Sequence, residues 1–325
     1  MSATPPLEAV TLGSRTSKLA RIQTDSVVDL FAVAWSGLEC HVRLMETQGD
    51  RTQSSGEPLP EIGGKGLFTA ELERALREGE IDLAVHSLKD LPTDEAPGIV
   101  IGAVCVREDS RDCLVARSGL TLADLPRGSV VGTSSLRREA QLHALRPDLE
   151  IRSIRGNVDT RVDKVLRGAY DAAVLAAAGI RRLGLEEAVT EWLEPEAILP
   201  APGQGALGVQ CRADDQRALA LLAAIDDPAS RVATTAERAF LRGLGSGCAA
   251  PVGAHAEVVA GGADDPSNSL LQGALRVRMN GLVASIDGSE VVRVRGEGIA
   301  EDLGERLARE ALAAGASRIL EAIRG

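Results

Sequence analysis

Lys89 and Asp90 are the first pair of residues whose types and position could carry chemistry. They stand in the segment IDLAVHSLKDLP, in which an apolar stretch over residues 81–86, expected to be a strand, leads directly into the charged pair. Ligands of open α/β sheets lie beyond the carboxyl ends of the strands, which is where this pair would stand. A carboxylate at that edge could exchange a proton with a substrate or stabilise a developing cation. The alternative interpretation is an ion pair in a solvated loop.

A second segment, VVGTSSLRREAQ, favours anion binding. Its hydroxyl residues Thr133, Ser134 and Ser135 stand between an expected strand and an expected helix. The N-terminus of a helix binds carboxylate or phosphate, because free backbone N–H groups converge there. Arg137 and Arg138 follow in the first turn, where cations oppose the helix dipole, so a bound anion would explain them. An ordinary helix cap flanked by surface arginines is the alternative.

Arginines gather again in RSIRGNVDTR, where Arg152, Arg155 and Arg161 surround a Gly-Asn turn. Arg15 and Ser17, in the first expected strand-to-helix turn, would form a matching anion site in another α/β unit. A guanidinium group binds a carboxylate at two points. Two facing units lined by arginine therefore imply a small polyanion between them.

Cys248 stands on a glycine-rich loop, in the segment LGSGCAAP. Glycines allow a bulky group to approach the backbone closely. Most single cysteines are small buried apolar residues. Spacing alone therefore leaves a reactive Cys248 and a structural one both open.

Three apparent motifs do not support the functions they suggest. The letters GQGALG at residues 203–208 match a dinucleotide fingerprint, but Pro200 and Pro202 precede them and a strand is expected to follow. The letters GGKG at 63–66 lack the first glycine and the Ser or Thr of a phosphate-binding loop. The four histidines and five cysteines show no paired ligand spacing, so we predict no metal site.

The elements that must position these residues alternate between strands and helices over the first two thirds of the chain. Expected strands lie at 10–13, 39–46, 81–86, 130–132, 150–154 and 206–211, and expected helices run from 17 to about 34, over 68–77 and over 136–145. The letters LREGEIDLAV at 76–85 and LRGAYDAAV at 166–174 are similar, which indicates two related α/β units. Residues 47–66 are rich in Gly, Ser and Pro and are expected to form a lid loop.

The last hundred residues change character. Alternating patterns predict strands at 270–279, 283–286 and 291–295, with a hairpin at Asp287-Gly288, and a final helix is expected over 300–314. This arrangement indicates a small third unit of the α+β class.

Composition excludes several classes of protein. The net charge of −11 and an aromatic content of 2% argue against nucleic-acid binding, which needs a basic face and stacking side chains. The chain has no apolar stretch long enough to cross a membrane, and its first residues have neither a basic start nor an apolar block. Five cysteines, an odd number without paired spacing, are typical of a reducing compartment. We therefore expect a cytoplasmic protein that binds neither nucleic acid nor membrane.

Taken together, these segments resemble the porphobilinogen deaminases, also called hydroxymethylbilane synthases. The resemblance covers nearly the whole chain, in order, through GSRTSKLA, TQGD, GGKGLFTAELE, DLAVHSLKDLP, REDSRD, GTSSLRREAQL, IRSIRGNVDTR, AAAGIRRLG, PAPGQGALG, AERAFL and GSGCAAPVG. It implies two α/β domains like those of type II periplasmic binding proteins and a smaller C-terminal α+β domain. The implied domains are residues 1–103 with 200–221, residues 104–199, and residues 222–325.

The resemblance also implies an activity. Members of this family join four porphobilinogen molecules head-to-tail, with loss of ammonia, and release hydroxymethylbilane for tetrapyrrole and haem biosynthesis. The chain grows on a dipyrromethane cofactor, joined by a thioether to the cysteine that matches Cys248. The family is usually monomeric. A non-catalytic module that binds a small polycarboxylate is the alternative, and the mass of the purified protein would separate the two.

Site residues follow from the same resemblance. The family's catalytic carboxylate matches Asp90. The cofactor-binding positions match Cys248, Lys89, Asp90, Thr133, Ser134, Ser135, Arg137, Arg138 and Arg155. The substrate-binding positions match Arg15, Ser17, Lys65, Phe68, Arg155, Arg161 and Gln204. Glu61 departs from the pattern, because many bacterial members have a second lysine there.

Overall fold

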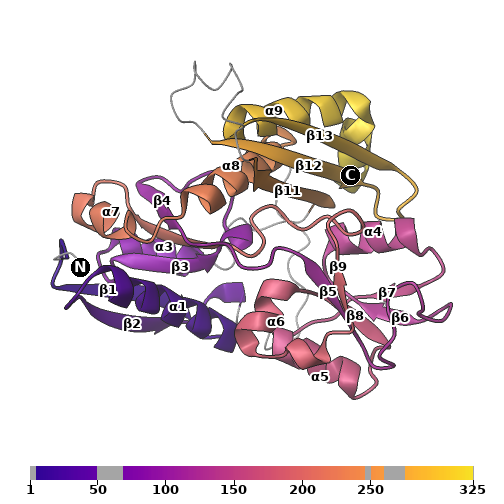
Figure 1. Ribbon diagram of the computed structural model, residues 1–325, viewed down its shortest axis with the longest axis horizontal. Coiled ribbons are helices and arrows are strands. Elements are labelled where there is room, and N and C mark those ends of the chain that lie inside the picture. Colours follow the sequence, from indigo (N-terminus) through magenta and orange to yellow (C-terminus); the bar gives the residue numbers. More distant parts are fainter. Residues whose placement is uncertain (1–4, 50–68, 246–249, 260–274, 325) are drawn as a thin grey trace.

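The computed structural model describes residues 5–49, 69–245, 250–259 and 275–324, and within them the strands form three sheets (Figure 1). The N-terminal sheet has the order β2 (Glu39–Met45), β1 (Ala9–Arg15), β3 (Leu83–Ser87), β10 (Leu207–Arg212), β4 (Ile99–Val104). The central sheet has the order β7 (Glu150–Arg152), β6 (Val130–Gly132), β8 (Ala172–Ala176), β5 (Asp112–Ala116), β9 (Glu191–Leu193). The C-terminal sheet consists of β11 (Val252–Val258), β12 (Arg276–Ala284) and β13 (Val291–Ile299).

The first two sheets are built to one plan. In each, the second strand in the order is parallel to both of its neighbours, and the fourth strand runs antiparallel to the strands beside it. The chain crosses from β4 into β5 and returns from β9 into β10. Strand β10 therefore inserts between β3 and β4, far from them in sequence. The predicted fold class is confirmed, and the domain bounds stay a prediction that this strand membership supports.

The helices cover both faces of these two sheets. On the N-terminal sheet, α1 (Lys18–Ala34) and α7 (Gln216–Leu222) contribute to one apolar cluster, and α3 (Ala70–Arg77) contributes to the other. On the central sheet, α4 (Leu136–Leu145) lies on one face, and α5 (Val158–Leu166) and α6 (Ala177–Leu183) lie on the opposite one. Successive residues of β8 alternate between the two clusters, as the period of a strand requires. Both faces are buried, so β8 reads as one apolar run.

The repeat seen in the sequence is a structural one. Asp82 directly precedes β3, and its carboxylate accepts a hydrogen bond from Thr11 N of β1 at 2.9 Å. Asp171 directly precedes β8, and its carboxylate accepts one from Val130 N of β6 at 2.8 Å. In both units the backbone N–H of the aspartate donates back to the same partner residue. The two aspartates therefore start equivalent parallel strands in the same way.

The C-terminal sheet packs against α8 (Pro228–Gly243) and α9 (Ala300–Ala311), which share its apolar cluster. The chain ends in the short element η4 (Leu312–Ala316) and in α10 (Ser317–Arg324). The expected separate strand at 283–286 is wrong, because β12 runs without a break to Ala284 and pairs with β13 along its whole length. The expected hairpin at Asp287-Gly288 is confirmed. Residues 50–66 of the expected lid lie outside the described residues.

The hairpin between β12 and β13 rests on α4. His143 Nδ1 of α4 donates to Ile286 O at 2.9 Å. Gly288 has a φ of 71°, and a Cβ added there would lie 2.3 Å from Ala144 N and 2.7 Å from the carbonyl carbon of His143. Only glycine fits at this contact, because a side chain would meet helix backbone that cannot rotate away.

We expect Gly288→Ala to lower the free energy of unfolding by about 1–3 kcal/mol, because it adds left-handed strain and a backbone clash. Urea denaturation measures the change. Gly298→Ala is the matched control in β13, since its added Cβ would meet Leu303 Cβ at an ordinary 3.5 Å. Equal stabilities of the two variants would show that the hairpin does not press on α4.

In the part of the chain that the structure describes, no helix is long and apolar enough to span a membrane.

Candidate active site

The N-terminal sheet places four predicted residues at or just beyond the ends of two neighbouring parallel strands. Arg15 ends β1 and Ser17 follows it, while Lys89 and Asp90 lie in η1 (Leu88–Asp90), directly after β3. Ser17 caps α1, where its Oγ accepts from Ala20 N at 3.4 Å. Asp90 is exposed, and Lys89 beside it is partly buried. Because the carboxylate of Asp90 is exposed, it can contact a bound substrate without a change in the backbone of η1.

The central sheet places its residues in the same way. Thr133, Ser134 and Ser135 follow β6, and Arg155 follows the parallel strand β7. Ser134 Oγ donates to Ile154 O at 2.7 Å, which joins the two segments. Thr133 Oγ1 accepts from Ser135 N at 3.2 Å, and Ser135 precedes α4 without a side-chain cap bond. The hydroxyl of Ser135 is thus not used to cap its own helix.

A buried carboxylate that the sequence analysis did not single out lies opposite the two arginines of α4. Asp112 is fully buried and accepts from Arg137 Nη1 and from Arg138 Nη2, both at 2.8 Å. Burial alone would raise the pKa of Asp112, but the two guanidinium groups outweigh it and hold this pKa well below its usual range. An internal anion therefore already stands where the sequence suggested a ligand.

Gln204 connects the two sheets across this carboxylate. Its Nε2 donates to Asp112 Oδ1 at 2.8 Å, and its Oε1 accepts from Lys89 Nζ at 3.2 Å. The Gln204 side chain is fully buried and engaged at both ends. Burial lowers the pKa of Lys89 to about 8; Asp90 and Asp112 oppose this shift, and Arg138 and Arg137 add to it. The result is a continuous polar chain from Lys89, the neighbour of Asp90, to the arginines of α4.

Positive charge accumulates at the far end of this chain. Arg161 Nε donates to Gly156 O at 2.8 Å, which fixes its side chain beside the turn that carries Arg155. Burial, together with the nearby charges of Arg138 and Arg155, lowers the pKa of Arg161 to about 10. Arg152 does not join the group, because it pairs with Glu150 at the surface at 2.6 Å. Arg138, Arg155 and Arg161 therefore form a cationic cluster suited to carboxylates.

Comparison with known proteins decides the family. The model described as "Porphobilinogen deaminase, dipyromethane cofactor binding domain" matches residues 10–220, and "Porphobilinogen deaminase, C-terminal domain" matches residues 232–313. The chain belongs to the porphobilinogen deaminase family.

Curated relatives carry the same name. The porphobilinogen deaminase of Roseiflexus castenholzii is 49% identical over 315 residues, which are 96% of this chain and 98% of the relative. That of Mycolicibacterium gilvum is 47% identical over 96% of this chain and 98% of its own. That of Deinococcus radiodurans is 43% identical over 98% of this chain and all of its own. The match to this family is thus of nearly full length.

Solved structures of other proteins have low sequence identity to this chain and low TM-scores. The BenM effector-binding domain with benzoate is 15% identical, with a TM-score of 0.41, over 67% of this chain and 90% of that one. The periplasmic VFT2 domain of Bordetella pertussis BvgS is 16% identical, with a TM-score of 0.41, over 67% of this chain and 86% of its own.

The dipyrromethane group that the family model names has carboxylate side chains, and the residues present fit them. Burial and the nearby charges of Arg138 and Arg155 together lower the pKa of Arg161, so a carboxylate bound at this cationic cluster would be stabilised. The buried Nε atoms of Arg137 and Arg138 meet no hydrogen-bond partner among the residues that the structure describes. The internal carboxylate of Asp112 holds the side chains of Arg137 and Arg138 in place.

The attachment position, Cys248, lies outside the described residues, as do Lys65 and Phe68. The other four cysteines of this family member are all described. Cys105, Cys113 and Cys211 are buried, and burial raises the pKa of the Cys105 and Cys113 thiols to about 12 and that of Cys211 to about 11. Burial also raises the pKa of Cys40. These thiols are poor nucleophiles. No cluster of three or more His, Cys, Asp or Glu side chains suited to a metal occurs among the described residues.

Sequence reasoning also missed the residue that fixes α8 to the rest of the molecule. Glu237 is fully buried, and its carboxylate accepts from both terminal nitrogens of Arg107, at 2.7 and 3.1 Å. It also accepts from Gly203 N and Ala256 N, each at 2.7 Å. One side chain thus joins α8 to the segments on which the chain crosses between sheets and to β11. The available signal is the acidic residue inside the apolar stretch AERAFL.

Proposed function

We propose that this protein is a hydroxymethylbilane synthase, a cytoplasmic monomer that joins four porphobilinogen molecules head-to-tail and takes part in haem biosynthesis. The cofactor is a dipyrromethane attached to Cys248. When bound, the dipyrromethane would supply the free pyrrole carbon to which the first porphobilinogen unit is joined. The observation that carries the proposal is the polar chain from Lys89, next to Asp90 in one sheet, through Gln204 to Asp112 and the cationic cluster of the other sheet.

The residues divide the work by charge. Each addition breaks the bond from the aminomethyl carbon to nitrogen, forms a carbon–carbon bond, and releases ammonia together with the proton of the attacked carbon. Loss of ammonia leaves positive charge on the substrate pyrrole. The exposed carboxylate of Asp90 stabilises this charge and accepts the released proton.

The cations orient the carboxylate arms of the substrate and of the growing chain. We assign Lys89, Thr133, Ser134, Ser135, Arg137, Arg138 and Arg155 to the cofactor, and Arg15, Ser17, Lys65, Phe68, Arg155, Arg161 and Gln204 to the substrate. Among these, Gln204 acts from behind, because its buried side chain bonds to Lys89 and Asp112. Its proposed contribution to substrate binding is therefore the orientation of the Lys89 ammonium group.

Intact mass and turnover of the purified protein test the proposal together. We expect consumption of porphobilinogen with release of hydroxymethylbilane, and a mass above that of the bare chain, with the added group on the peptide that contains Cys248. The control Cys248→Ser should have the mass of the bare chain. A bare-chain mass for the wild type, with reversible binding of polycarboxylates and no turnover, would instead support the non-catalytic binding module.

Arg155→Leu is expected to lower kcat/KM for porphobilinogen by about tenfold, because one charge-assisted contact to a carboxylate is worth about 1.5–3 kcal/mol. The fold should persist, since the change relieves repulsion with Arg161. Steady-state kinetics and thermal unfolding measure the two effects. Arg152→Leu is the control, because that arginine pairs with Glu150 at the surface. Unchanged kinetics with lost thermal stability would give Arg155 a structural role.

A further inference from the structure

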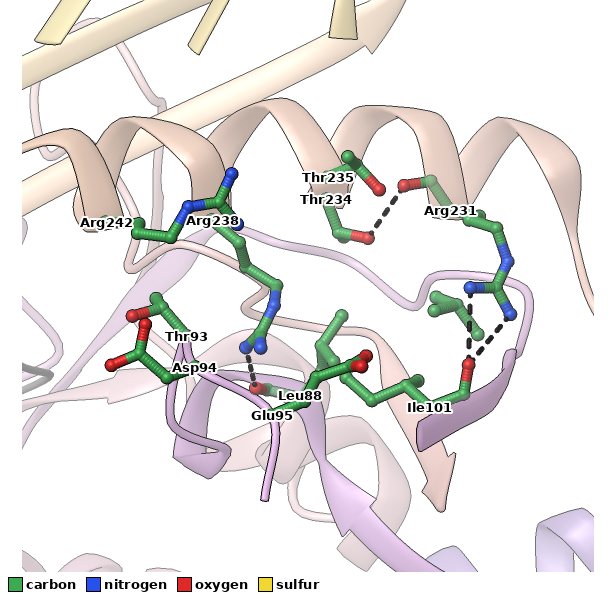
Figure 2. A pocket seen from close by; sticks show the side chains of 11 residues that line it. Leu88, Thr93, Asp94, Glu95, Ile101, Arg231, Thr234, Thr235, Arg238 and Arg242 are labelled. Carbon is green, nitrogen blue, oxygen red and sulfur yellow. Dashed lines mark hydrogen bonds between the residues drawn. The ribbon is translucent and has the colours of Figure 1, made fainter. Parts of the chain in front are cut away.

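Arg238 of α8 reaches from the C-terminal part of the molecule to the segment that carries Lys89 and Asp90. Its Nη2 donates to Pro92 O at 2.6 Å, and its Nη1 donates to Leu91 O at 3.1 Å and to Leu88 O at 3.5 Å. Figure 2 shows the side chain extending from α8 to the carbonyl of Leu88. One guanidinium group therefore collects three backbone carbonyls on both sides of the charged pair.

These carbonyls belong to a short turn whose apolar side chains, Leu88 and Leu91, are buried in one cluster with Val104 and Ala206. Within the turn, Leu91 N donates to Leu88 O at 3.2 Å, and Leu88 N is tied to Ala206 O at 3.0 Å. Lys89 is held from the other side by Gln204. Asp90 is exposed, so its position depends on the backbone that Arg238 binds.

A cavity of about 450 Å³ lies between this segment and α8. Its wall includes Leu88, Asp94 and Arg238, together with Arg231 and Arg242 of the same helix (Figure 2). This space would allow the turn at residues 88–92 to change its conformation if the hydrogen bonds from Arg238 were lost. The helix cannot follow it, because Glu237, next to Arg238, fixes α8 to Arg107, Gly203 and Ala256.

We propose that Arg238 is a positioning residue, which holds Asp90 and Lys89 at the substrate through the carbonyls of Leu88, Leu91 and Pro92; this inference rests on the proposed function. Arg238 does not touch the substrate. It sets the geometry of a carboxylate and an ammonium group that do, and an error of about 1 Å in such a group costs about 100-fold in rate in the extreme case.

Kinetics of Arg238→Ala provide the first test. We expect kcat for porphobilinogen to fall by about tenfold, with KM changed by no more than about twofold. About 20 mM guanidinium chloride, far below the molar concentrations that unfold proteins, should restore much of kcat by occupying the space that the side chain leaves beside the cavity.

Arg231→Ala is the matched control. Arg231 has the same side chain, lies on the same helix and lines the same cavity, but it donates to Gly102 O at 3.0 Å and pairs with Asp226 at 2.8 Å. Its loss should leave kcat unchanged and should produce no response to guanidinium.

The second test measures the titration of Lys89, which depends on the position of the turn and needs no catalytic turnover. Burial lowers the pKa of Lys89 to about 8, with Asp90, Arg138, Asp112 and Arg137 as the charges that act on it. Acetylation of the purified protein across pH, read by mass spectrometry, reports this titration, and exposed Lys18 is the internal reference. A loosened turn exposes Lys89 to solvent. The pKa of Lys89 should therefore be about one unit higher in Arg238→Ala than in the wild type, and it should not change in Arg231→Ala.

The outcomes separate the two hypotheses. A wild type that does not consume porphobilinogen overturns the proposed function, and the Lys89 titration then decides the role of Arg238 alone. An active wild type with equal kcat and equal Lys89 titration in Arg238→Ala and Arg231→Ala overturns the positioning role. If Arg238→Ala does not fold, Arg238→Lys takes its place, because one ammonium group cannot span three carbonyls. If Arg238→Lys had the kcat and the Lys89 titration of the wild type, the positioning role of Arg238 would also be overturned.

Discussion

Replacement of Asp90 by asparagine is expected to lower the rate of porphobilinogen consumption by about 100-fold or more, while the protein still folds. The amide keeps the shape of the side chain and removes its charge. A fixed negative charge stabilises the cationic transition state more than the ground state, so its loss lowers kcat rather than affinity. Asp90 is exposed at the end of η1, so the fold does not depend on it. Single-turnover consumption by cofactor-loaded protein measures the effect.

Two further variants define the role. Asp90→Glu keeps the charge and moves it by about one methylene, so it should retain partial activity. Asp94→Asn is the control, since Asp94 belongs to the same segment but lines the cavity on the α8 side. Its rate should stay within about a factor of two of the wild type. Wild-type rates in Asp90→Asn would leave Asp90 as no more than the ion-pair partner of Lys89.

Asp112→Asn is expected to lower the free energy of unfolding by about 3–5 kcal/mol, because it leaves two buried guanidinium groups without a counter-charge. The carboxylate is fully buried between Arg137 and Arg138. Because its pKa in the folded protein lies below its ordinary value, the stabilisation is present above that ordinary value and is lost only as the pH falls towards the folded-state pKa. The loss in Asp112→Asn should therefore be fully visible at neutral pH.

Urea denaturation followed by the fluorescence of Trp192 measures this change in a Trp35→Phe background. Trp192 lies on β9 opposite Cys113, the residue that follows Asp112, so it reports on the central sheet. The control is Asp163→Asn, which breaks the exposed pair of Asp163 with Arg167 and should cost less than about 1 kcal/mol. Equal stabilities of the two variants would show that a bound anion, and not Asp112, balances the arginines.

The elements that carry the site were predictable because their signals are local. The short apolar stretch before Lys89, and the cap-like residues before Arg137, need only a few neighbouring side chains to be recognised. For the same reason the residues beyond the ends of β3 and β6 could be named, since chain order alone places them at the carboxyl edge. The hairpin at Gly288 followed from its turn residues.

The partners of these residues were not predictable, because they come from distant parts of the chain. Asp112 precedes Arg137 by 25 positions, and Gln204 follows Lys89 by 115. Periodicity contains no information about such pairings. A signal was present nonetheless, since Asp112 opens the wholly buried strand β5, where a charge needs a partner. The prediction of a separate strand at 283–286 was wrong because it relied on a local weakening of the alternating pattern. Pairing with β13 keeps β12 continuous through this point.

The insertion of β10 between β3 and β4 also sets an order of events during synthesis. Strand β4 ends at Val104 and β10 begins at Leu207, so a ribosome that adds about 5–20 residues per second needs roughly 5–20 s to supply the missing strand. In that interval the nascent N-terminal sheet has an unpaired edge on β3, and all five strands of the central sheet, from Asp112 to Leu193, are synthesised. The strands of the central sheet are thus all synthesised before the N-terminal sheet can close, and until then the open edge of β3 can pair with another chain.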